Sequence, residues 1–277
     1  MRGVSENSQE RKRTARDRLV QQRELDRARD RRRRTLIVSA AVVGVLALAA
    51  VVGLIAANTG KDGGGGTAGP VVAPSGATGK DRLALRVGAG DAPVTLTIWE
   101  DFRCPVCAQF ENAFRETVAE LVDSGQVKAE YHLATIIDGN LGGSGSLRAA
   151  NAAACAQDAG EFAAYHDVLY RNQPPEADDA FGDNAKLIEL AGEVKGLDTP
   201  AFRDCVEDGA HDSWVEESDK AFSEGGFRGT PTVLLDGESV FPKKGDEEIS
   251  VARLKKWVAD AGRGKEPGRV SGTPPLS

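Results

Sequence analysis

The feature that most constrains the fold is a strand that gives way, within a few residues, to two cysteines at the start of a helix. Residues 94–99 consist of apolar residues and β-branched threonines, which is typical of a buried strand. After a short link, Cys104-Pro-Val-Cys107 opens an amphipathic helix. Pro105 suits the first helical turn, where its missing N–H costs nothing. The sequence therefore predicts two thiols at a helix N-terminus.

This position favours reactive sulfur chemistry. The first backbone N–H groups of a helix lack intrahelical partners, and the helix dipole favours negative charge there. A thiolate at Cys104 is therefore expected to be stabilised, because the pKa of a thiol in a C-x-x-C pair can fall one to several units below about 8.5. Cys107 lies three residues further on, close enough to resolve a mixed disulfide. The pair indicates a redox couple; a structural disulfide and half of a zinc site are the alternatives.

An uncharged segment near the N-terminus predicts a membrane anchor. Residues 35–57 are 23 residues without a charge, and as a helix they would extend about 35 Å, enough to cross a bilayer core. A cleaved signal peptide is the alternative, but its apolar core is normally shorter and follows a shorter basic region. Because residues 31–34 are four arginines, the positive-inside rule places residues 1–34 in the cytoplasm and everything after residue 57 outside the cell membrane.

The charges of the chain are unevenly divided. Residues 1–34 contain 13 Lys/Arg and six Asp/Glu, net +7, whereas the rest of the 277-residue chain has a net charge of −14. A basic arm that binds nucleic acid is the alternative, but acids are interleaved with the arginines and no aromatic residue is present to stack on bases. We interpret the segment as a solvated cytoplasmic tail beside the lipid surface, with no nucleic-acid partner.

Two segments of low apolar content delimit one domain. Residues 58–80 are rich in glycine and predict a flexible linker, and residues 265–277 contain three prolines and predict an unstructured tail. Between them, residues 81–264 form a domain of about 185 residues.

The first half of this domain predicts a parallel pair of strands. A weak strand at residues 83–87 precedes the strand at 94–99, and a third strand is expected over residues 127–136. The helix between the second and third strands carries one apolar face, formed by Phe110, Phe114, Val118, Leu121 and Val122. A right-handed crossover then places the two cysteines at the carboxyl end of the strand at 94–99.

A helical insert is expected over residues 140–226. It begins with a glycine-rich stretch, Gly139 to Gly145, which fits neither a P-loop nor a dinucleotide fingerprint and is interpreted as a connection. Thr199-Pro200 predicts the N-cap and first residue of one helix. The apolar residues that mark the helices of the insert are Leu147, Phe162, Tyr165, Leu169, Leu187, Ile188, Phe202, Val206, Trp214 and Phe222.

The sheet resumes after the insert. Gly229-Thr-Pro-Thr232 precedes a predicted hairpin, with strands at residues 233–235 and 239–241 joined by a turn at Asp236-Gly237. A final helix follows Glu247, with five residues expected to face inward, Val251, Leu254, Trp257, Val258 and Ala261.

These residues together resemble the DsbA-like thiol-disulfide oxidoreductases of the thioredoxin superfamily. The resemblance covers residues 83–261 and rests on three features in the correct order: the C-P-x-C turn, the helical insert and the Gly-Thr-Pro-Thr segment before a hairpin. It implies an α/β thioredoxin-like fold with an inserted helical subdomain. Cys104 and Cys107 would be catalytic. Pro231 would be cis and lie against them, Thr230 would offer backbone groups to bound polypeptide, and Pro105 and Val106 would complete the active-site loop.

The resemblance also implies the activity and its partners. A membrane-anchored enzyme of this kind would exchange disulfides with exported proteins as an oxidant, and a membrane protein of the DsbB or VKOR type would reoxidise it. No cofactor or metal is implied. Val106 departs from the family pattern, because strongly oxidising members have histidine between the cysteines. A change of about 1.4 kcal/mol in thiolate stability shifts the two-electron reduction potential by about 30 mV, so Val106 leaves the oxidising strength undetermined. A reducing or isomerising role therefore stays open. A non-redox module that binds peptides as a chaperone is a further alternative.

The remaining two cysteines are expected to pair with each other. Related proteins carry a structural disulfide in the insert, and the resemblance implies that Cys155 and Cys205 form it outside the cytoplasm. Two separate buried thiols are the alternative.

Several polar residues have no firm role. Glu100 and Asp101 precede the turn and are interpreted as proton acceptors, as charges that raise the thiol pKa by repulsion, or as solvated surface residues. Phe102 and Arg103 either border a peptide groove or only shape the turn. The three histidines, His132, His166 and His211, are expected to be packing or surface residues rather than metal ligands.

Overall fold

The computed structural model describes residues 70–269 of the chain. The predicted cytoplasmic tail, the predicted transmembrane helix at 35–57, the first part of the predicted linker and residues 270–277 lie outside the described residues. Within residues 70–269, no helix is both long enough and apolar enough to cross a membrane.

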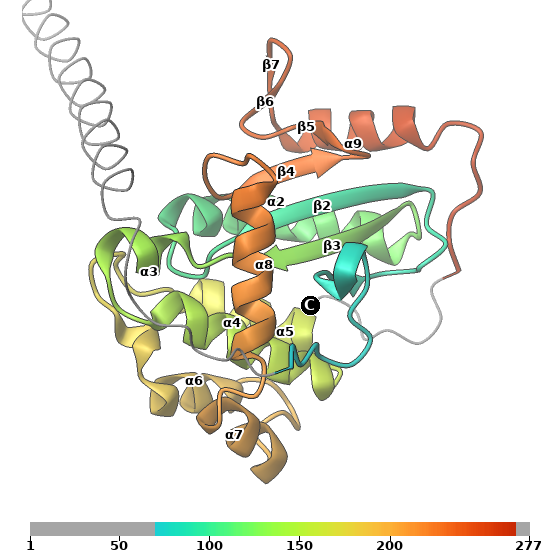
Figure 1. The fold of residues 1–277 in the computed structure, drawn as a ribbon. Helices are drawn as coiled ribbons and strands as arrows, with labels where there is room; N and C mark the ends of the chain where they lie inside the picture. Colours follow the sequence, from blue (N-terminus) through green and yellow to red (C-terminus); the bar gives the residue numbers. More distant parts are fainter. Residues whose placement is uncertain (1–69, 270–277) are drawn as a thin grey trace, which may run out of the picture. The chain divides into compact units, whose positions relative to one another are not determined.

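A five-stranded mixed sheet forms the centre of the domain (Figure 1). Its strands are β1 (Leu85–Val87), β2 (Val94–Glu100), β3 (Val127–Leu133), β4 (Thr232–Leu235) and β5 (Glu238–Ser239), in the order β1-β3-β2-β4-β5. The predicted parallel pair is confirmed, because β2 and β3 run side by side from Val94 opposite Val127 to Glu100 opposite Leu133. All other neighbouring strands in this sheet are antiparallel.

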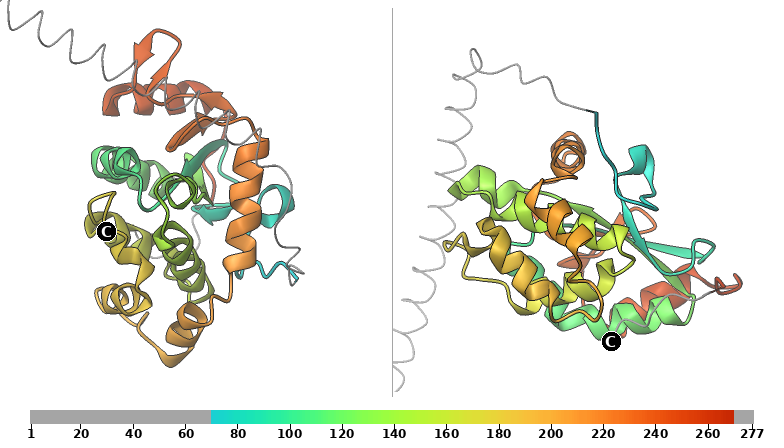
Figure 2. Two further views of the ribbon diagram at one scale, coloured as in Figure 1. Left: turned by 60° about the vertical axis from the view of Figure 1, so that its left-hand side comes forward. Right: turned by 90° about the horizontal axis from the view of Figure 1, so that it is seen from below.

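Helices cover both faces of the sheet. The predicted helix after Cys104 is α2 (Pro105–Asp123), and its apolar face is buried as expected. It lies beside α9 (Val251–Ala261), where Lys255 pairs with Glu120. Val251 is 42 % exposed rather than inward-facing, because it is the first residue of α9. On the opposite face, α8 (Asp212–Glu224) crosses the sheet, with Phe222 against Trp99 (Figures 1 and 2).

Six helices between β3 and β4 form the insert, and they confirm a helical subdomain inside a thioredoxin-like fold. They are α3 (Ile136–Leu141), α4 (Gly145–Asp158), α5 (Phe162–Arg171), α6 (Asn184–Ala191), α7 (Pro200–Glu207) and α8. Two short 3-10 helices occur at Lys80–Arg82 and Ala180–Gly182. The Thr199 hydroxyl accepts a hydrogen bond from the Phe202 N–H at 3.2 Å, and Pro200 is the first residue of α7, as predicted.

The boundary between β3 and the insert differs from the prediction. β3 ends at Leu133 rather than Ile136, and α3 occupies residues expected to extend the strand and begin the glycine-rich connection. The reason is a contact from elsewhere in the chain: the Asp101 carboxylate accepts a hydrogen bond from the Ile137 N–H at 2.9 Å, in the first turn of α3. Only residues 142–144 remain as the connection.

The C-terminal hairpin follows the prediction at its turn. Asp236 and Gly237 both have positive φ, 48° and 87°, which suits the two-residue turn that matches strand twist. β5 ends at Ser239, two residues earlier than expected. A further two-stranded ribbon, β6 (Lys243–Lys244) with β7 (Glu247–Glu248), was not predicted, and it delays the final helix to Val251.

Both ends of the described chain are held by hydrogen bonds. In the predicted linker, the Ser75 N–H donates to Asp158 at 2.6 Å and the Val72 carbonyl lies 2.8 Å from His211 Nδ1. In the predicted tail, the Gly268 N–H donates to the Gly125 carbonyl at 2.8 Å. Residues 70–80 and 265–269 are therefore attached to the domain, which their composition did not indicate.

Candidate active site

The two cysteines of the C-x-x-C pair lie at the junction of β2 and α2. Cys104 is the N-cap residue of α2, with extended backbone angles, and Pro105 is the first residue of the helix. Both cysteines are free thiols in this structure. Cys104 is 6 % exposed and Cys107 is fully buried. Val106, between them, is 42 % exposed and therefore forms part of the surface around Cys104.

The loop before β4 meets the cysteine turn. The Thr230–Pro231 peptide bond is cis. In its protonated form, the Cys104 thiol donates a hydrogen bond to the Thr230 carbonyl at 3.3 Å, across 126 positions of sequence. Pairing of β2 with β4 aligns the two segments, because Trp99 lies opposite Thr232 in the sheet. The structure thus brings together Cys104, Cys107, Thr230 and Pro231.

The surroundings of Cys104 favour its thiolate. A hydrogen bond from the Cys107 thiol is the largest influence, and together with Thr230 and two backbone N–H groups it outweighs burial and lowers the pKa of Cys104 to about 6. The backbone groups are the amides of Cys107 and Val106, in the first turn of α2. The Thr230 hydroxyl is buried and has no hydrogen-bond partner among residues 70–269, so it is free to donate to a thiolate at Cys104. The first helix amides therefore contribute, but the neighbouring thiol contributes most.

Cys107 has the opposite electrostatic setting. Burial is the main reason why its pKa lies well above the usual value, and its interactions with Cys104 raise it further. A thiolate at Cys104 beside a protonated Cys107 is the form that these surroundings favour. The two sulfur atoms are therefore unequal: Cys104, which is 6 % exposed, is favoured as the thiolate, and Cys107 is a fully buried thiol that can donate a hydrogen bond to it.

The two acids before the turn are not solvated surface residues. Glu100 and Asp101 are each 1 % exposed. Asp101 accepts hydrogen bonds from the Arg103 N–H at 2.8 Å and the Ser146 hydroxyl at 2.7 Å, in addition to the Ile137 N–H. Burial nevertheless raises the pKa of Asp101 to about 7. Asp101 therefore joins the cysteine turn to α3 and α4 from inside the domain.

Phe102 and Arg103 are buried and shape the turn rather than bordering a groove. Phe102 is 1 % exposed and Arg103 is 2 % exposed. The Arg103 guanidinium contacts Asp138 at 2.5 Å and Asp179 at 3.0 Å, and it donates to the Gly142 carbonyl at 2.9 Å. The residue immediately before Cys104 is therefore fixed to the insert.

Gln173 is a site residue that the sequence did not reveal. Its side-chain amide donates to the carbonyls of Phe102 and Cys104, at 2.9 and 3.0 Å. It follows α5 in the insert, and no spacing or motif distinguishes it from other polar loop residues. Its role depends on the way α5 lies against the turn, which only the fold shows.

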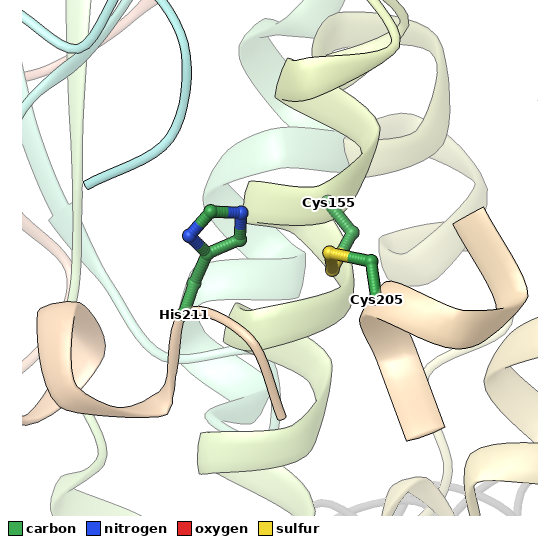
Figure 3. Close-up of side chains that lie close together, drawn as sticks. All are labelled: Cys155, Cys205 and His211. Atoms are coloured by element: carbon green, nitrogen blue, oxygen red, sulfur yellow. A yellow bond between two sulfur atoms is a disulfide. The ribbon is translucent and has the colours of Figure 1, made fainter. Parts of the chain in front are cut away.

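The other two cysteines form a disulfide within the insert (Figure 3). Cys155 in α4 and Cys205 in α7 are joined at an S–S distance of 2.03 Å, the pairing that the family resemblance implied. His211 lies beside them (Figure 3), with Nε2 2.9 Å from Asp158. Because both sulfur atoms are in the S–S bond, they are not available as metal ligands.

All three histidines are buried, and none is a surface residue. His132 stacks on Trp99 with ring centroids 4.1 Å apart, and burial lowers its pKa to about 4. His166 lies 2.7 Å from Glu100, and His211 contacts Asp158. His132 and His211 are packing residues, one of the two expected outcomes.

Comparison with known proteins shows the family. The family model described as thioredoxin matches residues 81–260. The solved structure of reduced DsbA from Mycobacterium tuberculosis is 28 % identical, covers 70 % of this chain and 95 % of that chain, and superposes with a TM-score of 0.56.

Two curated relatives match parts of the chain. A probable disulfide bond formation protein D of Bacillus cereus is 25 % identical over 160 residues, which are 56 % of this chain and 71 % of that protein. A Na(+)/H(+) antiporter, NhaA 3 of Salinispora tropica, is 29 % identical over 192 residues, which are 68 % of this chain and 27 % of the antiporter. The chain thus spans about a quarter of the antiporter's length.

Proposed function

Because this chain belongs to the thioredoxin family and has the DsbA-type form of its fold, we propose that it is a thiol-disulfide oxidoreductase. It exchanges disulfides with exported proteins through Cys104 and Cys107, and it acts as an oxidant. The observation that carries this proposal is the placement of Cys104 Sγ at the start of α2, 3.3 Å from the carbonyl that precedes cis-Pro231.

The oxidising reaction begins with the Cys104–Cys107 disulfide closed. A substrate thiolate attacks Cys104 Sγ and forms a mixed disulfide, while Cys107 leaves as a thiolate and takes up a proton. A second substrate thiolate then attacks the substrate sulfur in the mixed disulfide, and Cys104 leaves as a thiolate. The substrate loses two electrons and gains a disulfide, and the enzyme is left as a dithiol. Thr230, beside the attacked sulfur, offers its backbone to the substrate polypeptide.

The unequal thiols support the oxidising direction. A Cys104 pKa of about 6 makes this sulfur a good leaving group in the second step. The same stabilisation of the thiolate favours the reduced enzyme over its disulfide form, which makes the disulfide form a stronger oxidant. Val106 does not provide a charged partner, so the stabilisation comes from Cys107, Thr230 and the helix amides.

The proposal includes the location and the redox partner. Residues 35–57 anchor the protein in the cell membrane with residues 1–34 in the cytoplasm, and the catalytic domain acts outside. A membrane protein of the DsbB or VKOR type then removes two electrons from the Cys104–Cys107 dithiol after each cycle. The uncharged segment preceded by four arginines supports the orientation.

Alkylation trapping in intact cells tests the direction of exchange. Rapid acid quenching followed by a thiol-specific mass tag separates the closed disulfide from the dithiol, and Cys155 and Cys205 serve as the internal reference. An oxidant is expected to be mostly in the disulfide form at steady state. A mostly reduced Cys104–Cys107 pair would instead indicate a reductase or isomerase, and exchange activity that survives Cys104→Ser would refute the thiol mechanism.

A further inference from the structure

Apart from the cysteine pair, a cluster of buried polar side chains lies on the face of the sheet that α2 and α5 cover. It consists of Glu100 at the end of β2, Glu111 in α2 and His166 in α5. One possible ligand atom from each residue lies within 4.8 Å of the corresponding atoms of the other two. The three residues are 1 %, 3 % and 2 % exposed. The exchange reaction proposed above uses none of them.

Two carboxylate oxygens of this cluster lack partners. Glu100 Oε1 lies 2.7 Å from His166 Nε2, but Glu100 Oε2 and Glu111 Oε1 are buried without a hydrogen-bond partner among the described residues. A buried polar atom that is left unpaired is costly, and a buried charge even more so. These two atoms therefore indicate a partner that the side chains of residues 70–269 do not supply.

His166 has a carboxylate near each of its ring nitrogens. Its Nδ1 lies 3.6 Å from Asp167 Oδ1, while its Nε2 faces Glu100. A carboxylate behind the second ring nitrogen is the common way in which proteins hold a ligating imidazole. Arg115 Nε lies 3.0 Å from the same Asp167 oxygen. Asp167 is therefore placed to orient a ligating His166, and its charge is balanced by Arg115.

The charges and the available space fit one small cation. Burial raises the pKa of Glu111 to about 8, so without a cation this residue holds a proton that the cation would displace. Once Asp167 and Arg115 cancel and Glu111 is deprotonated, Glu100 and Glu111 would present two negative charges to a cation beside the His166 imidazole. A cavity of about 10 Å³ adjoins Glu111 and His166, about the smallest space that holds one water molecule, which can complete the coordination. The Arg115 side chain also lines this cavity and is 21 % exposed, so the path to solvent passes beside it.

We propose that Glu100, Glu111 and His166 bind one divalent transition-metal cation, with Zn²⁺ as the best fit. One imidazole nitrogen and two carboxylate oxygens, with a water as the fourth ligand, suit Zn²⁺. Ca²⁺ takes six to eight oxygen ligands, and Mg²⁺ keeps an octahedral shell with several waters, so neither suits this site. The bound cation would join β2, α2 and α5 beneath the redox couple.

Metal titration of the disulfide-closed protein tests this site directly. With Cys104 and Cys107 oxidised, no thiol among the four cysteines competes for the metal. Co²⁺ is expected to bind once per chain with visible d–d absorption bands and without sulfur-to-cobalt charge-transfer bands. One equivalent of Zn²⁺ should displace it and raise the midpoint of thermal unfolding. Failure of the disulfide-closed protein to bind one metal per chain would overturn the proposal, whatever the outcome for thiol exchange.

Matched variants locate the ligands. Glu111→Gln keeps the shape of the side chain and is expected to weaken Zn²⁺ binding at least about 100-fold, the upper end of what loss of a mere supporting group costs. Glu116→Gln, an exposed position on the same helix, should bind as the unchanged protein does. Near-UV circular dichroism verifies folding, and His166→Gln replaces Glu111→Gln if the latter does not fold. Equal binding by Glu111→Gln and Glu116→Gln would show that protons, not a metal, neutralise the cluster.

Discussion

Cys104 Sγ lies 3.3 Å from the carbonyl oxygen of Thr230, although 126 positions separate the two residues. The contact joins the N-terminus of α2 to the cis-Pro231 loop before β4. It places the reactive sulfur beside the backbone that would pair with a substrate chain.

Replacing each cysteine of the pair separately should give two different results. Cys104→Ser is expected to abolish disulfide exchange, because it removes the sulfur that forms the mixed disulfide with the substrate. Cys107→Ser cannot close the Cys104–Cys107 disulfide, but its Cys104 thiolate should attack a disulfide in an oxidised substrate. A mixed disulfide should then accumulate, visible on non-reducing gels, since no resolving thiol remains. Equal trapping by both variants would contradict the assignment of Cys104 as the attacked sulfur.

The rate at which iodoacetamide alkylates the reduced protein should rise at an unusually low pH. With the pKa of Cys104 at about 6, the alkylation rate at this residue should reach half of its plateau near pH 6 rather than near pH 9.

The lowered pKa of Cys104 also stabilises the fold of the reduced protein. That contribution is fully present above the unfolded-state pKa of about 9 and is lost as the pH falls towards 6. Denaturant unfolding of the reduced form between pH 5 and pH 9 measures the trend, with the disulfide form as the control.

Thr230→Val should raise the pKa of Cys104. The Thr230 side chain lowers this pKa, and its hydroxyl, which has no hydrogen-bond partner among the described residues, is free to donate to the thiolate. The variant should also be a weaker oxidant, because its thiolate is less stable. Thiolate absorbance against pH and redox equilibration with glutathione measure the two effects. Thr97→Val in β2 is the control, and an unchanged pKa in Thr230→Val would exclude the hydroxyl as a donor.

Gln173→Ala should destabilise the turn by about 1–2 kcal/mol, since two carbonyls in a largely buried region lose their side-chain donor. Urea unfolding measures the loss. Gln126→Ala, which removes a hydrogen bond only to the exposed Ser124 hydroxyl, should change stability by less than about 0.5 kcal/mol. A similar loss in both variants would mean that Gln173 does not hold the turn.

Joint replacement of Cys155 and Cys205 by alanine should cost stability without abolishing exchange. The disulfide closes a loop across 50 positions, for which the chain-entropy model gives about 4 kcal/mol. Chemical unfolding of the oxidised double variant measures this cost. Because the pair lies between α4 and α7 and away from Cys104, its exchange rate at low temperature should match that of the unchanged protein. A complete loss of exchange in a folded double variant would assign the second pair a redox role.

Several parts of the fold follow from local sequence patterns. The strand at 94–99, the apolar face of α2, the Thr199 cap and the Asp236-Gly237 turn all depend on residues close in sequence. The same holds for the placement of the cysteine pair at a helix start. These features were predictable because periodicity, capping and turn chemistry act over a few residues.

The cis-Pro231 loop beside the cysteines came from the family resemblance rather than from local pattern. Neither the family resemblance nor the local pattern predicted the start of α3 or the burial of Glu100 and Asp101. Ile136 belongs to a helix rather than to β3 because Asp101, distant in sequence, accepts the N–H of Ile137. Gln173 and Arg103 likewise reach groups that sequence spacing does not connect to them.

The sequence by itself therefore determined the position of the two thiols, a strand end followed by a helix start, and the order of the elements around them. Only the tertiary structure decided their inequality. The pKa values of Cys104 and Cys107 move apart because one thiol donates to the other, Thr230 lies against the first, and the second is buried. The Thr230 contact and the burial of Cys107 depend on packing between segments far apart in the chain. Such contacts leave no local signature in the sequence.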